Sequence, residues 1–171
     1  AYVTINRPEA YNACDQPTYD RLAEVWDDFA RNDEAWVAIL TGAGDKAFTA
    51  SNDLKFTTAE GKGTMLVSGF ADLSQRFDLE KLILAVVNGF AIGGGFETVL
   101  SCDIILCSDT AIFALPEVKV GFFGAASGVQ RLSRYIGRLA AQELKLTGRS
   151  MTAEEALSIG GCQRRGARSR P

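Results

Sequence analysis

The chain has 171 residues, 47% of them hydrophobic and 23% charged, with a formal net charge of −3. This composition predicts a soluble globular domain with a sizeable core. Histidine is absent, which excludes histidine metal ligands and every Ser-His or Cys-His nucleophile pair. Residues 1–160 hold all 21 acidic residues and 14 of the 18 basic ones, and their net charge of −7 argues against a nucleic-acid partner.

Hydropathy and cysteine usage indicate the compartment. The chain has no run of about 18 apolar residues such as a membrane helix needs, and it starts without the pattern of a secretory signal. We therefore expect a cytoplasmic protein that does not bind membranes. The cysteines form no CxxC pair and are predicted to be reduced and mostly buried; they are Cys14, Cys102, Cys107 and Cys162.

Periodicity predicts strands alternating with helices along residues 1–160, which indicates one α/β core domain. Strands are expected at 2–5, 36–40, 82–87, 103–107 and 111–115, and helices at 15–30, 65–77, 96–101, 128–135, 138–147 and 152–159. Asp15 is expected to cap the first helix, and Thr152 opens a capping box with Glu155. Residues 161–171 contain four arginines and no apolar period, so this tail is expected to be disordered.

The strongest local signal is the apolar strand 82–87, which leads into Gly93, Gly94 and Gly95 and a short helix. Glycine lets the backbone approach a ligand closely, and the first N–H groups of a helix lack acceptors within the helix. Gly94 is therefore a candidate donor to an anion or a developing oxyanion, although a tight turn needed only for packing would use the same glycines. The spacing matches neither the dinucleotide-binding nor the Walker pattern.

Two glutamates lie beside this turn, because Glu97 is in the first turn of the short helix and Glu117 follows the last predicted strand. Each alone is commonly just a favourable charge at a helix start. Together, the two carboxyl groups are suited to general acid and base work. The polar turn 49–54 offers a second backbone donor, Asn52, so that two N–H groups would meet at one carbonyl oxygen, while Asp53 is expected to cap that turn.

Seven stretches, which follow one another in the order typical of the family, resemble the crotonase superfamily, also called the enoyl-CoA hydratase/isomerase family. They are residues 4–10, 40–48, 52–54, 87–95, 102–104, 113–117 and 146–149. The resemblance implies a spiral of repeated ββα units, assembled as a homo-trimer or hexamer, which binds an acyl-CoA thioester. It implies no metal and no cofactor beyond the coenzyme A of the substrate. Residues 95–97, 107–109 and 113–117 are most similar to the family's branch of carnitinyl-CoA dehydratases.

The resemblance also implies roles for site residues. The N–H groups of Asn52 and Gly94 would hold the thioester oxygen, and Glu97 and Glu117 would hold the water that adds across the double bond. Contacts to coenzyme A or to the rest of the substrate are implied for Ala10, Ala50, Asp53, Leu54, Gly93 and Gly124. The predicted reaction is hydration or dehydration of an enoyl-CoA thioester, which would make the protein a hydro-lyase.

The sequence departs from the family pattern at several places. Ser51 stands where the family usually has glycine, Leu82 replaces a common proline, and Phe123 and Ala126 alter the loop after Glu117. The family's C-terminal helices, which cover the active site and build the trimer, are missing or replaced by the arginine-rich tail. Two alternatives stay open: another reaction on this scaffold, such as double-bond isomerisation or thioester hydrolysis, and an inactive, truncated subunit that only binds coenzyme A or assembles.

Overall fold

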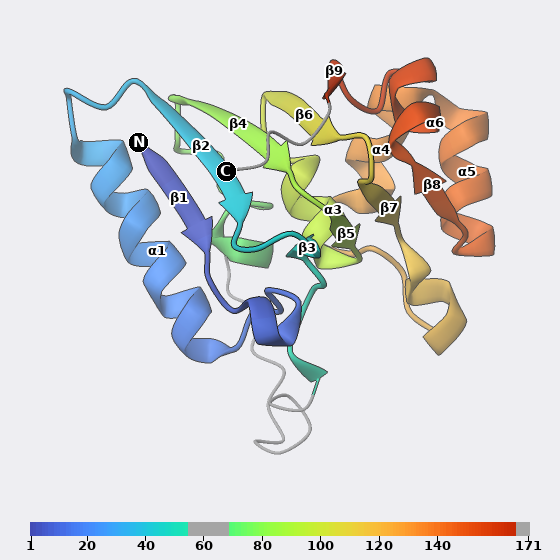
Figure 1. Ribbon diagram of the computed structural model, residues 1–171, viewed down its shortest axis with the longest axis horizontal. Coiled ribbons are helices and arrows are strands. Elements are labelled where there is room, and N and C mark those ends of the chain that lie inside the picture. Colours follow the sequence, from blue (N-terminus) through green and yellow to red (C-terminus); the bar gives the residue numbers. More distant parts are fainter. Residues whose placement is uncertain (55–68, 167–171) are drawn as a thin grey trace.

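The computed structural model describes residues 1–54 and 69–166, and its strands form two sheets (Figure 1). The larger sheet is parallel and contains, in order, β1 (Tyr2–Ile5), β2 (Val37–Gly42), β4 (Leu82–Val87), β6 (Ile104–Ser108) and β9 (Arg164–Gly166). The smaller sheet contains β3 (Ala47–Thr49), β5 (Phe90–Ile92), β7 (Ile112–Ala114) and β8 (Ser150–Thr152), with β8 antiparallel to β7. Strands β2, β4 and β6 are each followed by a strand of the smaller sheet, so the chain advances as a spiral of strand pairs.

Helices complete each turn of the spiral. They are α1 (Gln16–Arg31), α3 (Gly94–Val99), α4 (Gly128–Ile136), α5 (Arg138–Thr147) and α6 (Ala153–Ser158), with 3-10 turns η1 (Pro8–Ala10), η2 (Phe70–Asp72) and η3 (Pro116–Val120). Both predicted N-caps are confirmed, because the Asp15 side chain accepts from the Thr18 N–H and the Thr152 side chain from the Glu155 N–H. The predicted α/β architecture of ββα units is confirmed as well.

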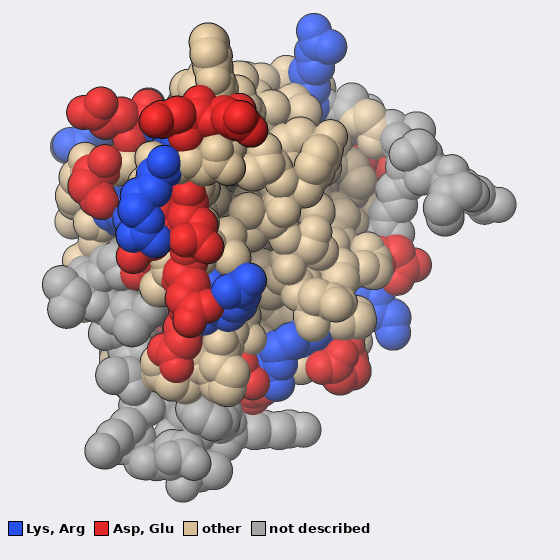
Figure 2. Space-filling view, turned by 90° about the vertical axis from the view of Figure 1, so that its left-hand side faces the viewer, with Lys and Arg blue, Asp and Glu red and all other residues tan. Residues whose placement is uncertain are grey.

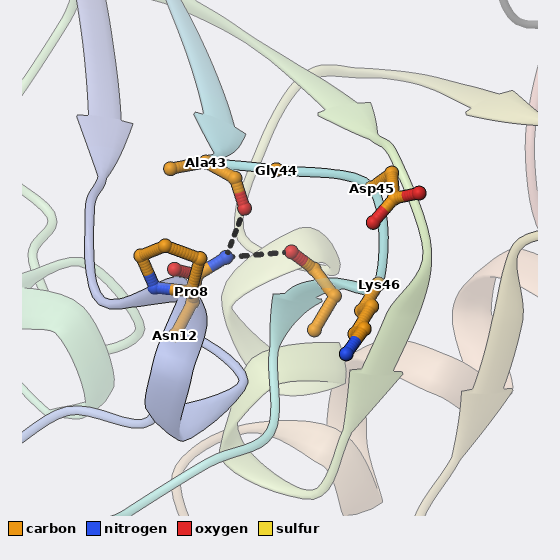
Figure 3. Close-up of a pocket in the computed structure, with 7 residues that line it drawn as sticks. Pro8, Asn12, Ala43, Gly44, Asp45 and Lys46 are labelled. Carbon is orange, nitrogen blue, oxygen red and sulfur yellow. Dashed lines mark hydrogen bonds between the residues drawn. The ribbon is translucent and has the colours of Figure 1, made fainter.

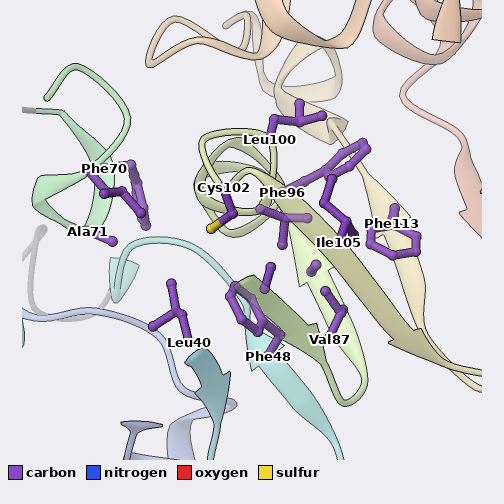
Figure 4. Close-up of a cluster of buried hydrophobic side chains, with 14 of the residues drawn as sticks. Leu40, Phe48, Phe70, Ala71, Val87, Phe96, Leu100, Cys102, Ile105 and Phe113 are labelled. Atoms are coloured by element: carbon purple, nitrogen blue, oxygen red, sulfur yellow. The ribbon is translucent and has the colours of Figure 1, made fainter. Parts of the chain in front are cut away.

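The core lies where the inward faces of the two sheets meet α3 (Figure 4). Strands of the larger sheet alternate between buried and more exposed residues, as in β4, where Ala85 and Val87 are fully buried. Phe96 of α3 packs against Phe113 of β7 with ring centroids 5.2 Å apart. Burying an aromatic ring of this kind contributes roughly 2 to 3 kcal/mol. This packing fixes α3, and with it Gly94 and Glu97, at the end of the smaller sheet.

Two successive turns of the spiral are joined at Asn88, which lies between β4 and β5. Its Nδ2 donates to the carbonyl oxygens of Gly42 and Gly44, both at 2.9 Å. The next residue has no room for a side chain, because a Cβ on Gly89 would lie 2.2 Å from the carbonyl oxygen of Lys46. The β2–β3 and β4–β5 turns are therefore held in direct backbone contact.

The predicted helix at 65–77 is wrong over residues 69–77, and residues 65–68 lie outside the described part of the chain. The segment forms only η2, in which Ala71 and Asp72 have left-handed φ values of +54° and +53°. The Trp26 Nε1–H donates to the Ala71 carbonyl oxygen at 3.0 Å, which holds this irregular turn against α1. Phe70 is buried whereas Phe77 is 84% exposed, so the apolar residues at this spacing do not share the single buried face that a helix would give them.

The prediction of a disordered tail from residue 161 is wrong as far as Gly166, while 167–171 lie outside the described residues. Cys162 is buried, and β9 pairs with the edge of β6. The Gln163 N–H donates to the Ile105 carbonyl oxygen at 2.9 Å, and the Gln163 side chain accepts from the Ile105 N–H at 2.6 Å. Backbone pairing at a sheet edge requires no apolar side chains, so hydropathy could not reveal this strand. All four cysteines are buried, as predicted, and the Sγ atoms of Cys107 and Cys162 lie 3.5 Å apart.

The face of the molecule on the side of α1 carries charges of both signs beside a broad uncharged area (Figure 2). Two ion pairs on α1 join Arg21 to Glu24 at 2.6 Å and Arg31 to Asp28 at 3.0 Å. All four side chains are well exposed, so these pairs contribute little to stability.

Candidate active site

Glu97 and Glu117 lie near each other because the strands that precede them are neighbours. β5 leads through Gly93 into α3 and Glu97, and β7 leads into η3 and Glu117. The two strands pair in parallel, with Ile92 opposite Ala114. The Gly93 N–H donates to the Ala114 carbonyl oxygen at 2.9 Å, which carries the pairing beyond the strand end. Parallel pairing thus brings two carboxylates from distant parts of the sequence to one edge of the smaller sheet.

Glu97 is buried, with 3% of its surface exposed. Its Oε1 accepts hydrogen bonds from the backbone N–H groups of Ser127 at 3.0 Å and Gly128 at 2.8 Å. Burial raises the pKa of Glu97 above its ordinary value, the charge of Glu117 raises it further, and the backbone N–H groups oppose this rise. A Cβ on Gly124 would lie 3.1 Å from the same Oε1, so glycine at position 124 leaves the space beside the carboxylate open.

Glu117 is half-buried at the start of η3. Its Oε2 is buried and, within the described residues, has no hydrogen-bond partner. Burial raises the pKa of the Glu117 carboxyl group. An unpartnered carboxylate oxygen is costly to bury, and such a group in a native structure calls for a functional explanation. Glu117 therefore has both the raised pKa and the free oxygen that a proton donor needs.

The polar turn after β3 is held in place by the segment that precedes α1. The Cys14 N–H donates to the Ser51 carbonyl oxygen at 2.8 Å, and the Asp53 N–H donates to the Cys14 carbonyl oxygen at 2.9 Å. In this parallel bridge between Cys14 and Asn52, the Asn52 N–H is directed away from Cys14. None of the described residues accepts a hydrogen bond from it. The turn thus presents one free backbone donor.

Ser51 has a left-handed backbone conformation, which favours glycine, with φ of +86°. Its Oγ accepts a hydrogen bond from the Gly94 N–H at 3.2 Å. A Cβ built on Gly93 would lie 3.0 Å from Glu117 Oε1 and 3.1 Å from Ser51 Oγ. The polar turn, the glycine-rich turn and Glu117 therefore meet at Gly93, where only glycine fits and where φ is +57°.

Phe70 covers the glycine-rich turn from the side of η2. A Cβ on Gly94 would lie 2.2 Å from two atoms of the Phe70 ring, and the ring meets that of Tyr19 edge-on at 5.5 Å. The Tyr19 hydroxyl in turn donates to the Asn52 side chain. Tyr19 and Phe70 thus connect the two turns that carry the predicted backbone donors, Asn52 and Gly94. Sequence reasoning did not single out either aromatic residue for the site.

The remaining predicted contacts with coenzyme A lie within the polar turn or, for Ala10, in the N-terminal segment bonded to it. Ala50 N–H donates to the Tyr11 carbonyl oxygen at 3.1 Å, directly after Ala10 at the end of η1. Asp53 forms an ion pair with Arg7 at 3.1 Å. Leu54 is 72% exposed, directly before the segment outside the described residues.

Asn12 is a positioning residue that the sequence analysis missed. It is fully buried, and its Nδ2 donates to the carbonyl oxygens of Ala43 at 2.9 Å and Ala47 at 2.7 Å. Its Oδ1 accepts from the Arg7 N–H at 2.9 Å. Figure 3 shows the two side-chain donations behind a small pocket, which is lined by Pro8, Asn12, Ala43, Gly44, Asp45, Lys46 and Ala47. Asn12 thereby fixes the N-terminal loop against the turn that leads into β3.

Comparison with known proteins decides the family. Residues 1–164 match the family model described as enoyl-CoA hydratase/isomerase. The chain belongs to this family. The spiral of strand pairs is the fold that this enoyl-CoA hydratase/isomerase family member shares with solved structures.

Curated relatives and solved structures agree with this assignment. The chain is 45% identical over 161 residues to carnitinyl-CoA dehydratase of Citrobacter koseri and to that of Escherichia coli K12, covering 92% of this chain and 61% of each relative. It resembles the crystal structure of carnitinyl-CoA hydratase from Mycobacterium avium with a TM-score of 0.91 and 37% identity, covering 97% of this chain and 64% of that one. It resembles the crystal structure of enoyl-CoA hydratase from Bacillus anthracis with a TM-score of 0.88 and 31% identity, covering 97% of this chain and 66% of that one.

The chain thus spans about three fifths of the length of these curated relatives. Over residues 1–54 and 69–166, acidic and cysteine side chains gather in no group of three that would suit a metal ion. No helix in these two ranges has the length and apolarity needed to span a bilayer.

Proposed function

We propose that the protein catalyses the hydration of an enoyl-CoA thioester and the reverse dehydration of a β-hydroxyacyl-CoA. The observation that carries this proposal is the buried Glu97 and the half-buried Glu117 next to two turns with backbone N–H groups directed toward the site. Water addition across a double bond conjugated to a carbonyl needs three things: a polarised carbonyl, a base for the water, and an acid for the α-carbon. The residues gathered around Gly93 supply a candidate for each.

The thioester carbonyl oxygen is proposed to bind between the N–H groups of Asn52 and Gly94. Hydroxide addition at the β-carbon moves negative charge onto this oxygen, and two fixed donors stabilise the resulting enolate. Loss of one such donor costs about 100- to 1,000-fold in kcat in enzymes that use this device. Because the amides carry the charge stabilisation, the proposal requires no metal ion and no cofactor apart from the coenzyme A of the substrate.

The two glutamates are assigned different roles from their surroundings. Glu97 is proposed to orient and deprotonate the water, because hydrogen bonds from Ser127 and Gly128 favour its carboxylate form. Glu117 is proposed to protonate the α-carbon, because its buried, unpartnered Oε2 favours the protonated form. The water's oxygen is bonded to the β-carbon, its proton passes to Glu97, and the proton of Glu117 passes to the α-carbon. Dehydration follows the same path in reverse.

Acyl specificity and assembly complete the proposal. The relatives named carnitinyl-CoA dehydratase favour a carnitinyl-type acyl group, with Ala10, Ala50, Leu54 and the backbone around Asp53 contacting coenzyme A. We further propose a cytoplasmic homo-trimer or hexamer. Large apolar side chains on η3, its following loop and α5 support assembly, since Val120, Phe122, Phe123, Leu139 and Leu146 are 67 to 78% exposed.

Product analysis tests the proposal. The chain is incubated separately with crotonyl-CoA, crotonobetainyl-CoA and a 3-enoyl-CoA, and products are separated by liquid chromatography with mass detection. Hydration predicts a mass gain of one water in the first two reactions. A shifted double bond from the 3-enoyl-CoA would favour isomerisation, free coenzyme A would favour thioester hydrolysis, and binding without any product would indicate a subunit that only binds the thioester. Each of these three outcomes, without hydration, contradicts the proposal.

A further inference from the structure

Ser51 uses the same amide hydrogen that the proposed function assigns to the substrate. The Gly94 N–H donates to Ser51 Oγ at 3.2 Å, whereas no described residue accepts from the Asn52 N–H. Ser51 has little freedom to move as a whole, because its carbonyl oxygen is bonded to the Cys14 N–H and its φ is +86°. The hydroxyl can leave the Gly94 N–H only by rotation about the Cα–Cβ bond.

A backbone N–H has one hydrogen, so Ser51 Oγ and a thioester oxygen compete for the Gly94 donor. We propose that the Ser51 hydroxyl occupies half of the oxyanion site when no thioester is bound and is displaced when a thioester binds. This inference rests on the proposed function. Ser51 would then be a positioning residue that weakens the binding of thioesters and has no effect on ligands without the carbonyl oxygen.

The size of the effect follows from the exchange of one neutral hydrogen bond for another. Serine side chains rotate within picoseconds to nanoseconds when unhindered, so displacement does not slow binding. The bond that is lost stabilises the empty site by the ordinary net contribution of a neutral hydrogen bond, which corresponds to about 3- to 10-fold in affinity. Ser51 also keeps the Gly94 N–H bonded in the empty site, where an unsatisfied donor would be unfavourable.

The test compares two ligands that differ at one oxygen: butyryl-CoA, a thioester without a double bond to hydrate, and S-butyl-CoA, the thioether without the carbonyl. Isothermal titration calorimetry gives the affinity of both for the wild-type chain, Ser51→Ala and Ser51→Gly. Ser51→Ala removes the hydroxyl and keeps the strained backbone, whereas Ser51→Gly removes both. Ser158→Ala, on an exposed face of α6, is the matched control, and thermal unfolding confirms that each variant is folded.

We expect both Ser51 variants to bind butyryl-CoA about 3- to 10-fold more tightly than wild type, with S-butyl-CoA affinity unchanged within about twofold. Unchanged or weaker binding of butyryl-CoA by Ser51→Ala overturns the inference, and so does an equal gain for both ligands. A gain confined to Ser51→Gly also overturns it, because backbone strain would then be the cause. Absence of butyryl-CoA binding by all the chains overturns the proposed function, and the inference with it.

Discussion

Glu97 and Glu117 stand 20 positions apart in the sequence, yet they lie so near each other that the charge of Glu117 raises the pKa of Glu97. The cause is the parallel pairing of β5 with β7, since each carboxylate follows one of these strands. Burial acts on both groups in the same direction. The chain therefore maintains two partly desolvated acids at one sheet edge, an arrangement that costs stability and that general acid and base catalysis would explain.

Replacing Glu117 by glutamine should abolish hydration and preserve ligand binding. The substitution keeps the shape of the side chain and removes the proton that the proposed mechanism delivers to the α-carbon, so kcat for crotonyl-CoA should fall by at least about 100-fold. The affinity for S-butyl-CoA, measured by calorimetry, should change by less than about threefold, because it does not depend on this proton. Glu97→Gln should show the same pattern.

The control for both variants is Glu24→Gln, which makes the same chemical change at an exposed position of α1. It should retain wild-type kcat. Full turnover by Glu117→Gln, with the loss of activity confined to Glu97→Gln, would exclude Glu117 as the proton donor.

Glu117→Gln should also stabilise the fold at neutral pH. Burial raises the pKa of Glu117, so the folded state binds this proton more tightly than the unfolded state. The stability that results is fully present below the unfolded pKa and is lost as pH rises through the folded pKa. At neutral pH the buried charge is therefore unfavourable, and the neutral glutamine removes that cost. The Tm of the variant should exceed that of wild type at about pH 7, and the difference should vanish near about pH 4.

Thermal unfolding followed by circular dichroism across this pH range measures the difference. Glu24→Gln again serves as the control, because its carboxylate is exposed. A Tm difference that grows as the pH falls would have the wrong sign and would contradict the assigned burial of Glu117.

Gly94→Ala should be harmful because of Phe70, and this coupling can be measured. The added methyl would lie 2.2 Å from the ring, and Phe70 is itself buried, so the ring has little room to shift. We expect Gly94→Ala to lower the free energy of unfolding by about 1 to 3 kcal/mol, as overpacked cores do. In the double variant with Phe70→Ala, the added methyl has space. The double variant should therefore lose less free energy of unfolding than the sum of the losses of the two single variants. Additive losses in urea unfolding would show that the two residues do not touch.

Local chemistry made part of this molecule predictable. Asp15 and Thr152 were identified as caps because a capping side chain bonds an N–H only two or three residues away, and the run 82–87 was identified because it is both apolar and β-branched. Strands β3, β5 and β8 have three residues each, too few to show a period. The turn at Ala71 depends on a contact with Trp26, 45 residues away in sequence, which no local pattern records.

The candidate site likewise contains residues that the sequence predicted and residues that it did not. Glu97 and Glu117 were predicted from their positions after apolar strands, and the structure places them near each other, while their catalytic roles stay predictions. Asn12 gave no signal, because a buried asparagine and a turn asparagine look identical in sequence. Ser51 was noted as a replacement of glycine, but its bond to the Gly94 N–H follows from the meeting of two turns 43 residues apart.

Asn12→Ala should loosen the N-terminal loop. Asn12 makes three hydrogen bonds while fully buried, and alanine would leave the Arg7 N–H and two carbonyl oxygens without these partners. We expect a loss of about 2 to 4 kcal/mol in the free energy of unfolding, measured by urea denaturation. Asn6→Ala, at an exposed position of the same loop, is the control and should change stability by less than about 0.5 kcal/mol. Equal effects of the two substitutions would contradict the positioning role of Asn12.

Gln163→Ala tests whether the segment before β9 is part of the sheet in solution. The Gln163 side chain accepts from the Ile105 N–H at 2.6 Å, so its removal should expose that amide and speed its hydrogen exchange, with a loss of about 1 kcal/mol in stability. Gln130→Ala, on the exposed side of α4, controls for loss of a glutamine side chain and should leave Ile105 protected. Fast hydrogen exchange of the Ile105 amide already in the wild-type chain would mean that residues 162–166 do not pair with β6. That result would support the expectation of a disordered tail.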